Sequence, residues 1–274
     1  MKSMKVIVIL LFFLSDCSFH PPENKVLRIK GSDTMFMLTE QLANEFMNDN
    51  PGFIVHNEGG GSQLGIRALI KGEVDLCATS RTLKSDEIKK LAENFNLVGI
   101  SHLIAKDALS IYVNEGNSIR NLELDQVKKI FSGRVTNWSE VGGDNEKIDV
   151  IIRSPNSGTH YYFYEHILEE ENYATSATVK NLTEEIIEEV RKNKNAIGYG
   201  GIGFSKEVPH ILINGIEPNI ENVKNDSYPI IRYLYFYTQN NPDGLTKKFL
   251  DWVNSREGQK IIRNSGYISL WDFE

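Results

Sequence analysis

The sequence predicts an α/β protein with a largely parallel sheet. Short apolar runs alternate with stretches in which apolar residues recur at helical spacing, and this alternation is typical of parallel α/β organisation. Four of the apolar runs end in polar turns rich in hydroxyl side chains or glycine. In open α/β sheets, ligands bind beyond the carboxyl ends of the strands, where helix N-termini gather. The fold class therefore predicts a ligand site built from these turns.

The N-terminus indicates a targeting signal rather than part of the fold. The apolar run 6–14 follows two lysines and is shorter than the ~20 residues of a transmembrane helix. Cys17 comes soon after it, as in a bacterial lipoprotein signal, so residues 1–17 are predicted to be the signal with Cys17 as its lipidated end. Asp16 departs from the small residue usual at that position. A simple secretory peptide and an uncleaved anchor stay open as alternatives, and residues 18–24 are predicted to be a tether.

The remaining elements follow from periodicity. Strand-like runs begin near Leu27, Phe53 and Val74, and the segments 104–113 and 228–237 are predicted to be long and extended. Helical spacing predicts helices over 35–48, 64–71, 85–94, 123–131, 159–170, 182–193 and 244–263. Cys77 falls in a buried strand and is expected to be inert packing without a disulfide partner.

The segment 152–161 has the composition of an oxyanion site. Ser157 and Thr159 carry hydroxyl donors on either side of Gly158, just where a helical pattern begins. The free N–H groups and positive dipole end of that helix face the same spot, and Arg153 adds a planar fork of charged donors. A serine that simply caps a helix is the alternative, and for an isolated motif it would be preferred.

Other donor-rich turns precede this segment. Ser32 and Thr34 follow the first strand-like run, three glycines and Ser62 follow the second, and Ser80 follows the third. Three consecutive glycines indicate close approach of the backbone to a ligand. The three turns and the segment 152–161 are therefore predicted to meet at one anion site.

Six motifs, taken in chain order, resemble those of the phosphate-binding proteins of the high-affinity phosphate ABC importer. They are Gly31-Ser32-Asp33-Thr34-Met35, Gly59-Gly60-Gly61-Ser62, Ala78-Thr79-Ser80-Arg81, Phe131-Ser132-Gly133-Arg134-Val135-Thr136-Asn137-Trp138, Arg153 with Ser157-Gly158-Thr159, and Ala196-Ile197-Gly198-Tyr199. The resemblance implies a two-domain type II periplasmic-binding-protein fold with a ligand cleft and two crossover strands. It also implies domain I over 25–107 plus 233–274 and domain II over 108–232. The implied function is extracytoplasmic capture of inorganic phosphate and its delivery to ABC permease subunits.

The resemblance also implies the ligand residues. Arg153 is the expected cation, and Arg81 is either a second cation or the partner in a surface ion pair. The expected phosphate-binding residues are Ser32, Asp33, Thr34, Gly61, Ser62, Ser80, Arg81, Arg153, Ser157, Gly158 and Thr159.

Asp33 is a carboxylate inside a donor-rich motif. Hydrogen phosphate carries a proton near neutral pH and sulfate does not, so a carboxylate acceptor favours phosphate. The better-known branch of the family places carboxylates where this chain has Ser80 and Pro155, and Asp33 is the nearest replacement. It is predicted either to accept the phosphate proton or to orient Arg153. A helix cap is the plain alternative, whereas Glu58 is expected to be a solvated turn residue.

Composition excludes several other classes. The formal net charge of -7 argues against nucleic acid as a partner. No metal or other cofactor is expected, because the histidines show no ligand spacing; they are His20, His56, His102, His160, His166 and His210. No catalytic residues are expected, although a secreted serine hydrolase or phosphatase using Ser62 or Ser157 is an alternative. Within binding proteins, a receptor for sulfate or molybdate on the same fold is the other alternative.

Overall fold

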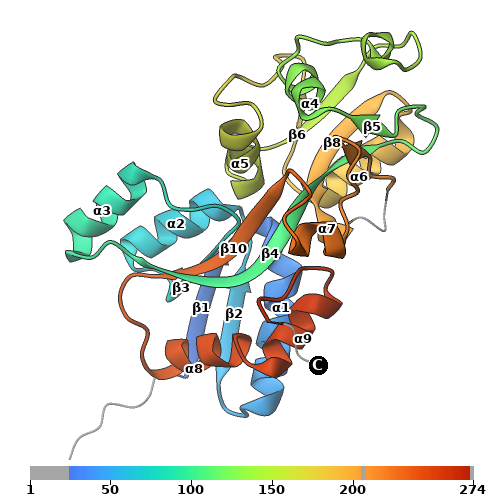
Figure 1. Ribbon diagram of the computed structural model, residues 1–274. Coiled ribbons are helices and arrows are strands. Elements are labelled where there is room, and N and C mark those ends of the chain that lie inside the picture. The colour runs from blue at the N-terminus through green and yellow to red at the C-terminus, as the bar shows by residue number, and fades with distance from the viewer. Residues whose placement is uncertain (1–24, 205–207, 272–274) are drawn as a thin grey trace, which may run out of the picture.

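The computed structural model describes residues 25–204 and 208–271, and in it the chain forms two α/β lobes that share one sheet (Figure 1). The eight strands of that sheet run in the order β2-β1-β3-β10-β4-β8-β6-β7, and β5 pairs with β9 in a small separate ladder. The strands are β1 (Val26–Gly31), β2 (Ile54–Glu58), β3 (Leu76–Thr79), β4 (Ile100–Val113), β5 (Asn121–Leu122), β6 (Asp149–Arg153), β7 (Thr178–Lys180), β8 (Ala196–Gly201), β9 (Leu212–Ile213) and β10 (Ile231–Thr238). The predicted signal, Cys17 and the tether lie outside the described residues.

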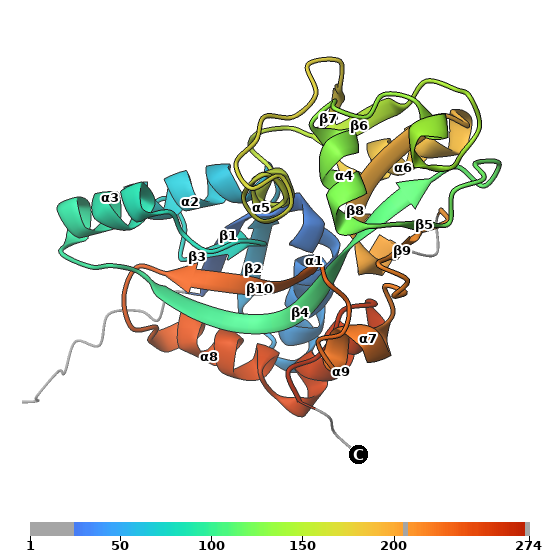
Figure 2. The same cartoon turned by 45° about the horizontal axis from the view of Figure 1, so that its top comes forward.

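The first lobe is built around three parallel strands, because β1 pairs in parallel with both β2 and β3. The helices α2 (Ser62–Lys71) and α3 (Ser85–Phe95) lie on one side of these strands, and α1 (Asp33–Asp49), α8 (Gly244–Val253) and α9 (Arg256–Asn264) lie on the other (Figure 2). The helical spacing expected in α1 is confirmed, since its apolar positions Met35, Leu38, Leu42 and Phe46 are all buried. Buried apolar faces of this kind account for most helical stability in proteins.

Two long antiparallel strands join the lobes. β10 lies between β3 and β4 and pairs with both, with Arg232 opposite Asp107 in the β10–β4 ladder. β4 continues into the second lobe and pairs there with β8. The two extended segments that the sequence predicts over 104–113 and 228–237 correspond to these strands.

The second lobe continues the sheet with β8, β6 and β7. Its helices are α4 (Leu124–Phe131), α5 (Gly158–His166), α6 (Thr183–Lys192) and the short α7 (Ile220–Lys224), with 3-10 turns at Trp138–Val141 and Ile202–Phe204. Its largest core cluster draws on residues 108–230 together with Ile268, whereas the largest cluster of the first lobe draws on 27–105 and 234–267. Each lobe therefore has its own hydrophobic core.

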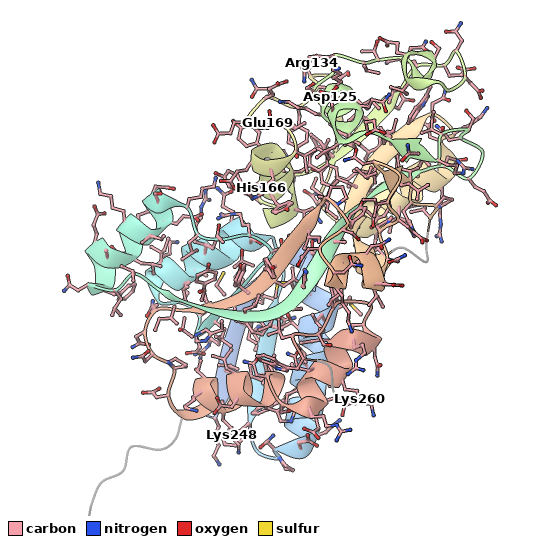
Figure 3. The ribbon with its side chains drawn as sticks, viewed as in Figure 1. Asp125, Arg134, His166, Glu169, Lys248 and Lys260 are labelled. Atoms are coloured by element: carbon pink, nitrogen blue, oxygen red, sulfur yellow. The ribbon has the colours of Figure 1, made fainter. Side chains whose placement is uncertain are left out.

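Two helix predictions differ from the structure. The helix expected over 244–263 is two helices, because Ser255 caps the second by accepting a hydrogen bond from the Gly258 N–H. The helix expected over 159–170 ends at His166, and Glu169 and Glu170 both have positive φ. Figure 3 shows His166 and Glu169 near the end of α5 in the second lobe, far from Lys248 and Lys260 on α8 and α9.

Candidate functional site

The donor-rich turns of the first lobe meet at one buried place. Ser32 precedes α1, Ser62 begins α2, and Ser80 follows β3, and all three side chains are buried. The Ser32 hydroxyl donates to Ser80 Oγ at 3.3 Å, and the Ser80 N–H donates to Ser62 Oγ at 3.3 Å. The sequence therefore predicted correctly that these turns converge.

The second lobe adds the N-terminus of α5 to the same place. Thr159 Oγ1 lies 3.0 Å from Thr34 Oγ1, and both side chains are buried. Gly158 has no room for a side chain, because a Cβ there would lie 2.3 Å from Ser62 Oγ and 2.6 Å from Ser80 Oγ. The start of α5 is thus packed directly against the hydroxyls of the first lobe.

Ser157 has the capping role that the sequence left open. Its Oγ accepts hydrogen bonds from the N–H groups of Thr159 at 3.1 Å and His160 at 3.4 Å. A serine hydroxyl can accept such bonds and still donate its own proton elsewhere. The cap is therefore compatible with a ligand contact from the same side chain.

Gly61 allows the two lobes to approach each other. Its φ is 96°, its N–H donates to the Gly31 carbonyl at 2.9 Å, and a Cβ on it would lie 2.5 Å from the Asn156 carbonyl oxygen. The neighbouring Gln63 N–H donates to that same carbonyl at 3.2 Å. The conformational freedom of glycine at this turn is thus used for contact between the lobes.

Arg153 is the buried cation of the site, with 1% of its surface exposed. Its Nη1 donates to Thr183 Oγ1 at 2.9 Å and its Nε to the Asn181 carbonyl at 3.1 Å, which leaves Nη2 facing Asp33. Burial lowers the pKa of the guanidinium, and the Asp33 carboxylate partly opposes that shift. An arginine keeps its charge even so, because its ordinary pKa lies far above neutral pH.

Asp33 connects this cation to the glycine turn. Its Oδ1 accepts a hydrogen bond from the Gly60 N–H at 2.6 Å, and its Oδ2 lies 3.4 Å from Arg153 Nη2. The residue at the cap position of α1 is Ser32, so the alternative that Asp33 is a helix cap is wrong. The Asp33 carboxylate instead faces Arg153, in agreement with the alternative that Asp33 orients this arginine.

Arg81 is engaged by a different carboxylate. Its guanidinium donates to both oxygens of Glu87, at 2.8 and 2.7 Å, and to the Thr82 carbonyl at 2.7 Å. Both side chains of this ion pair are buried, whereas the ion-pair alternative drawn from the sequence placed it at the surface. These bonds use three of the five N–H donors of the guanidinium, so the pair with Glu87 does not exhaust its capacity to donate.

The sequence did not predict a second buried ion pair, between Arg232 and Asp107. Arg232 in β10 donates through Nε to Asp107 Oδ2 at 2.8 Å and through Nη1 to Thr159 Oγ1 at 2.7 Å. Both charged side chains are at most 1% exposed, and burial raises the pKa of Asp107 although Arg232 opposes the shift. A signal was present, since the two extended apolar segments contain charged residues of opposite sign, Asp107 in one and Arg232 in the other.

His160 braces the backbone of Arg153. Its Nδ1 lies 2.7 Å from the Arg153 carbonyl oxygen, which can only accept, so Nδ1 carries the proton. Burial is the main cause that lowers the pKa of His160, and the charge of Arg153 adds to it. His160 is therefore neutral near neutral pH.

A pocket of about 240 Å³ opens beside the buried hydroxyls. Its wall includes Ser80, Arg232 and the aromatic rings of Tyr162, Tyr233 and Tyr235. Residues 25–204 and 208–271 contain no group of three or more His, Cys, Asp and Glu side chains placed to hold a metal ion. Among the helices of those same ranges, none has the length and apolar character needed to cross a membrane. The site thus offers many hydrogen-bond donors and three buried cations, Arg81, Arg153 and Arg232.

Two lobes joined by crossover strands, with a donor-rich site between them, define a solute-binding protein. Comparison with known proteins gives the family: a PBP superfamily domain matches residues 20–257. The chain is 31% identical over 256 residues to the phosphate-binding protein PstS of Bacillus subtilis (strain 168), and the match covers 90% of this chain and 82% of that protein. The chain belongs to this family of substrate-binding receptors, so the hydrolase alternative is excluded.

Solved structures confirm the type II fold. A candidate phosphate ABC transporter substrate-binding protein from Clostridium perfringens, solved with bound phosphate, matches with a TM-score of 0.82 at 29% identity over 90% of this chain and all of that one. An ABC-type phosphate transport receptor from Vibrio cholerae matches with a TM-score of 0.75 at 30% identity, covering 89% of this chain and 99% of that one.

Proposed function

We propose that this protein captures inorganic phosphate between its lobes and delivers it to the permease of an ABC importer. The observation that carries the proposal is the convergence of hydroxyl donors from both lobes beside the buried Arg153, in a chain of the PstS family. A buried anion is stable when its charge is matched by hydrogen bonds and by a cation, and this site supplies both.

The proposed ligand groups have distinct roles. Arg153 supplies charge, and the N-terminus of α5 at Gly158 supplies backbone N–H groups and a favourable dipole. Gly61 allows the lobes to meet, and Arg81 stays with Glu87. The hydroxyl donors proposed to surround the phosphate are Ser32, Thr34, Ser62, Ser80, Ser157 and Thr159.

Asp33 favours phosphate over other oxyanions such as sulfate and molybdate. Its Oδ2 makes one long contact, 3.4 Å to Arg153, and so retains the capacity to accept a proton from a ligand. Hydrogen phosphate provides that proton, whereas a fully ionised oxyanion would place an oxygen against the carboxylate. The same carboxylate therefore attracts one ligand and repels the other.

We further propose that the lobes move as domain I, over 25–107 plus 233–274, and domain II, over 108–232. Along the chain, core residues belong to the cluster of the first lobe up to residue 105 on β4 and to the cluster of the second lobe from residue 108. They belong to the first-lobe cluster again from residue 234 on β10, after residue 230. Hinges are formed by a few residues at which packed units meet.

Lipid attachment at Cys17 would hold the protein outside the cytoplasm at a bacterial membrane. In a bacterial host, wild type is expected in the membrane fraction with incorporated palmitate, and Cys17→Ser is expected to be released without label. Label that persists in Cys17→Ser would contradict the lipid anchor and leave the phosphate proposal untouched.

Calorimetric titration of refolded, ligand-stripped protein tests the main proposal. Phosphate is expected to bind far more tightly than sulfate or molybdate. Ser62→Ala is expected to weaken phosphate binding by about 1–3 kcal/mol, because it removes a buried donor. The matched control is Ser85→Ala at the exposed start of α3, which should bind as wild type does. Tighter binding of sulfate or molybdate than of phosphate would assign the site to another oxyanion.

A further inference from the structure

The Asp107–Arg232 pair lies where the two crossover strands pass between the lobes. The two residues are directly opposite in the β10–β4 ladder, and they flank both proposed domain boundaries. Arg232 contacts Asp107 Oδ2 with Nε at 2.8 Å and with Nη2 at 2.7 Å. Asp107 Oδ1 in turn accepts a hydrogen bond from the Ile202 N–H at 3.2 Å. Asp107 therefore holds the Arg232 guanidinium in one orientation.

The remaining nitrogen of that guanidinium faces the anion site. Arg232 Nη1 donates to Thr159 Oγ1 at 2.7 Å, so this oxygen acts as an acceptor on that side. A hydroxyl has one proton, and it cannot donate that proton to a guanidinium, which has no acceptor. The Thr159 proton must point elsewhere, and Thr34 Oγ1, which belongs to the other lobe, lies 3.0 Å away.

We propose that Arg232 is a positioning residue that aims the Thr159 hydroxyl proton toward the anion in the cleft. The assignment rests on the proposed function, because it takes Thr159 to be one of the phosphate donors. A charged donor shortens and strengthens the hydrogen bond it makes, and it polarises the hydroxyl that accepts it. Arg232 thereby makes Thr159 a better and fixed donor without touching the ligand itself.

An ordinary structural ion pair would stabilise the hinge but would show no energetic coupling to one hydroxyl. A double-mutant cycle separates the two roles, because the coupling of two residues appears as non-additive effects on affinity. The first change is Asp107→Asn with Arg232→Gln, which leaves no charge unpaired. The second change is Thr159→Val, which keeps the shape of the side chain and removes the hydroxyl.

Calorimetric titration with inorganic phosphate is the measurement. The Asp107→Asn/Arg232→Gln change is expected to weaken binding about tenfold when Thr159 is present and less than about twofold when valine replaces it. Tyr228→Phe is the control, since it removes another buried hydrogen bond of the hinge, from the Tyr228 hydroxyl to the Leu109 carbonyl at 3.1 Å. Its effect should be the same with threonine or valine at position 159.

Equal effects of the Asp107→Asn/Arg232→Gln change in both backgrounds would overturn the positioning role. If that variant fails to fold in melting curves, the same cycle is carried out with Arg232→Lys, which keeps a charge beside Asp107 but has a single nitrogen. Wild type that binds no phosphate would contradict the proposed function instead, so the two failures are distinguishable.

Discussion

Asp33→Asn separates two roles of the Asp33 carboxylate: its hydrogen bonds to neighbouring residues and its proposed selection of phosphate. In the structure Oδ1 accepts from the Gly60 N–H at 2.6 Å and Oδ2 faces Arg153 Nη2 at 3.4 Å. An asparagine side chain has one acceptor oxygen. In either orientation its NH₂ group therefore faces a donor, which is the Gly60 N–H or Arg153 Nη2. Because Arg153 keeps two other acceptors and the Asp33 side chain is 15% exposed, we expect a stability cost of about 1 kcal/mol.

The effect on selectivity should be larger. Phosphate loses a charged acceptor for its proton, and sulfate no longer meets a carboxylate, so the preference for phosphate should fall by about 2–4 kcal/mol, or about 30- to 1,000-fold. Arsenate carries a proton as phosphate does and should follow phosphate in both proteins.

The assay is competitive calorimetric titration near neutral pH with phosphate, arsenate and sulfate, together with melting curves without ligand. Glu58→Gln is the matched control, because Glu58 is a half-exposed carboxylate near the same turn whose pKa is lowered mainly by its hydrogen bond with Lys30. This control should retain the wild-type selectivity. A sulfate-to-phosphate ratio that is unchanged in Asp33→Asn, with a lower melting temperature, would show that Asp33 only braces its neighbours.

Three further changes test other parts of the site. Arg153→Gln should weaken phosphate binding by about 2–5 kcal/mol in a titration, since it leaves a buried anion without its cation; unchanged affinity would mean that the wrong arginine was assigned. Gly158→Ala should reduce affinity about tenfold or more with little change in melting temperature, because its Cβ would lie 2.3 Å from Ser62 Oγ and 2.6 Å from Ser80 Oγ when the lobes meet. Burial lowers the pKa of His160 in the folded state, so the unfolded chain binds its proton more readily and stability should fall as the pH drops below about 6.5. Melting curves from about pH 5 to 8 should show a weaker pH dependence in His160→Gln, and equal curves would contradict the assignment.

The sequence predicted the parts of the site that depend on local patterns. A hydroxyl beside a glycine at the start of a helix is visible in the chain itself, and Ser32, Ser62 and Gly158 lie where that pattern implied, while Ser80 lies in the polar turn predicted after the third strand. The order of strands and helices was likewise readable from periodicity. The resemblance to a family then supplied the crossover strands, which periodicity alone does not show.

The features that the sequence did not predict depend mostly on contacts between residues separated in the chain. Arg81 and Glu87 form a buried pair, although Arg81 follows a strand in a polar turn and Glu87 lies in the first turn of the next helix. Asp107 and Arg232 lie 125 positions apart, and only the β10–β4 register brings them together. The break between α8 and α9 was missed because Asn254 and Ser255 do not interrupt the apolar spacing strongly enough to predict it.

The position of β10 between β3 and β4 has a consequence for the order in which the chain can assemble. β3 and β4 are consecutive in the sequence, yet the strand that joins them is residues 231–238, and α8 and α9 that cover the first lobe come later still. During synthesis the second lobe can therefore assemble from one continuous stretch, while the first waits for almost the last residues. Because long-range pairing closes slowly, we expect formation of β10 to limit the refolding rate, and a chain that stops before residue 231 would leave the edges of β3 and β4 open to aggregation.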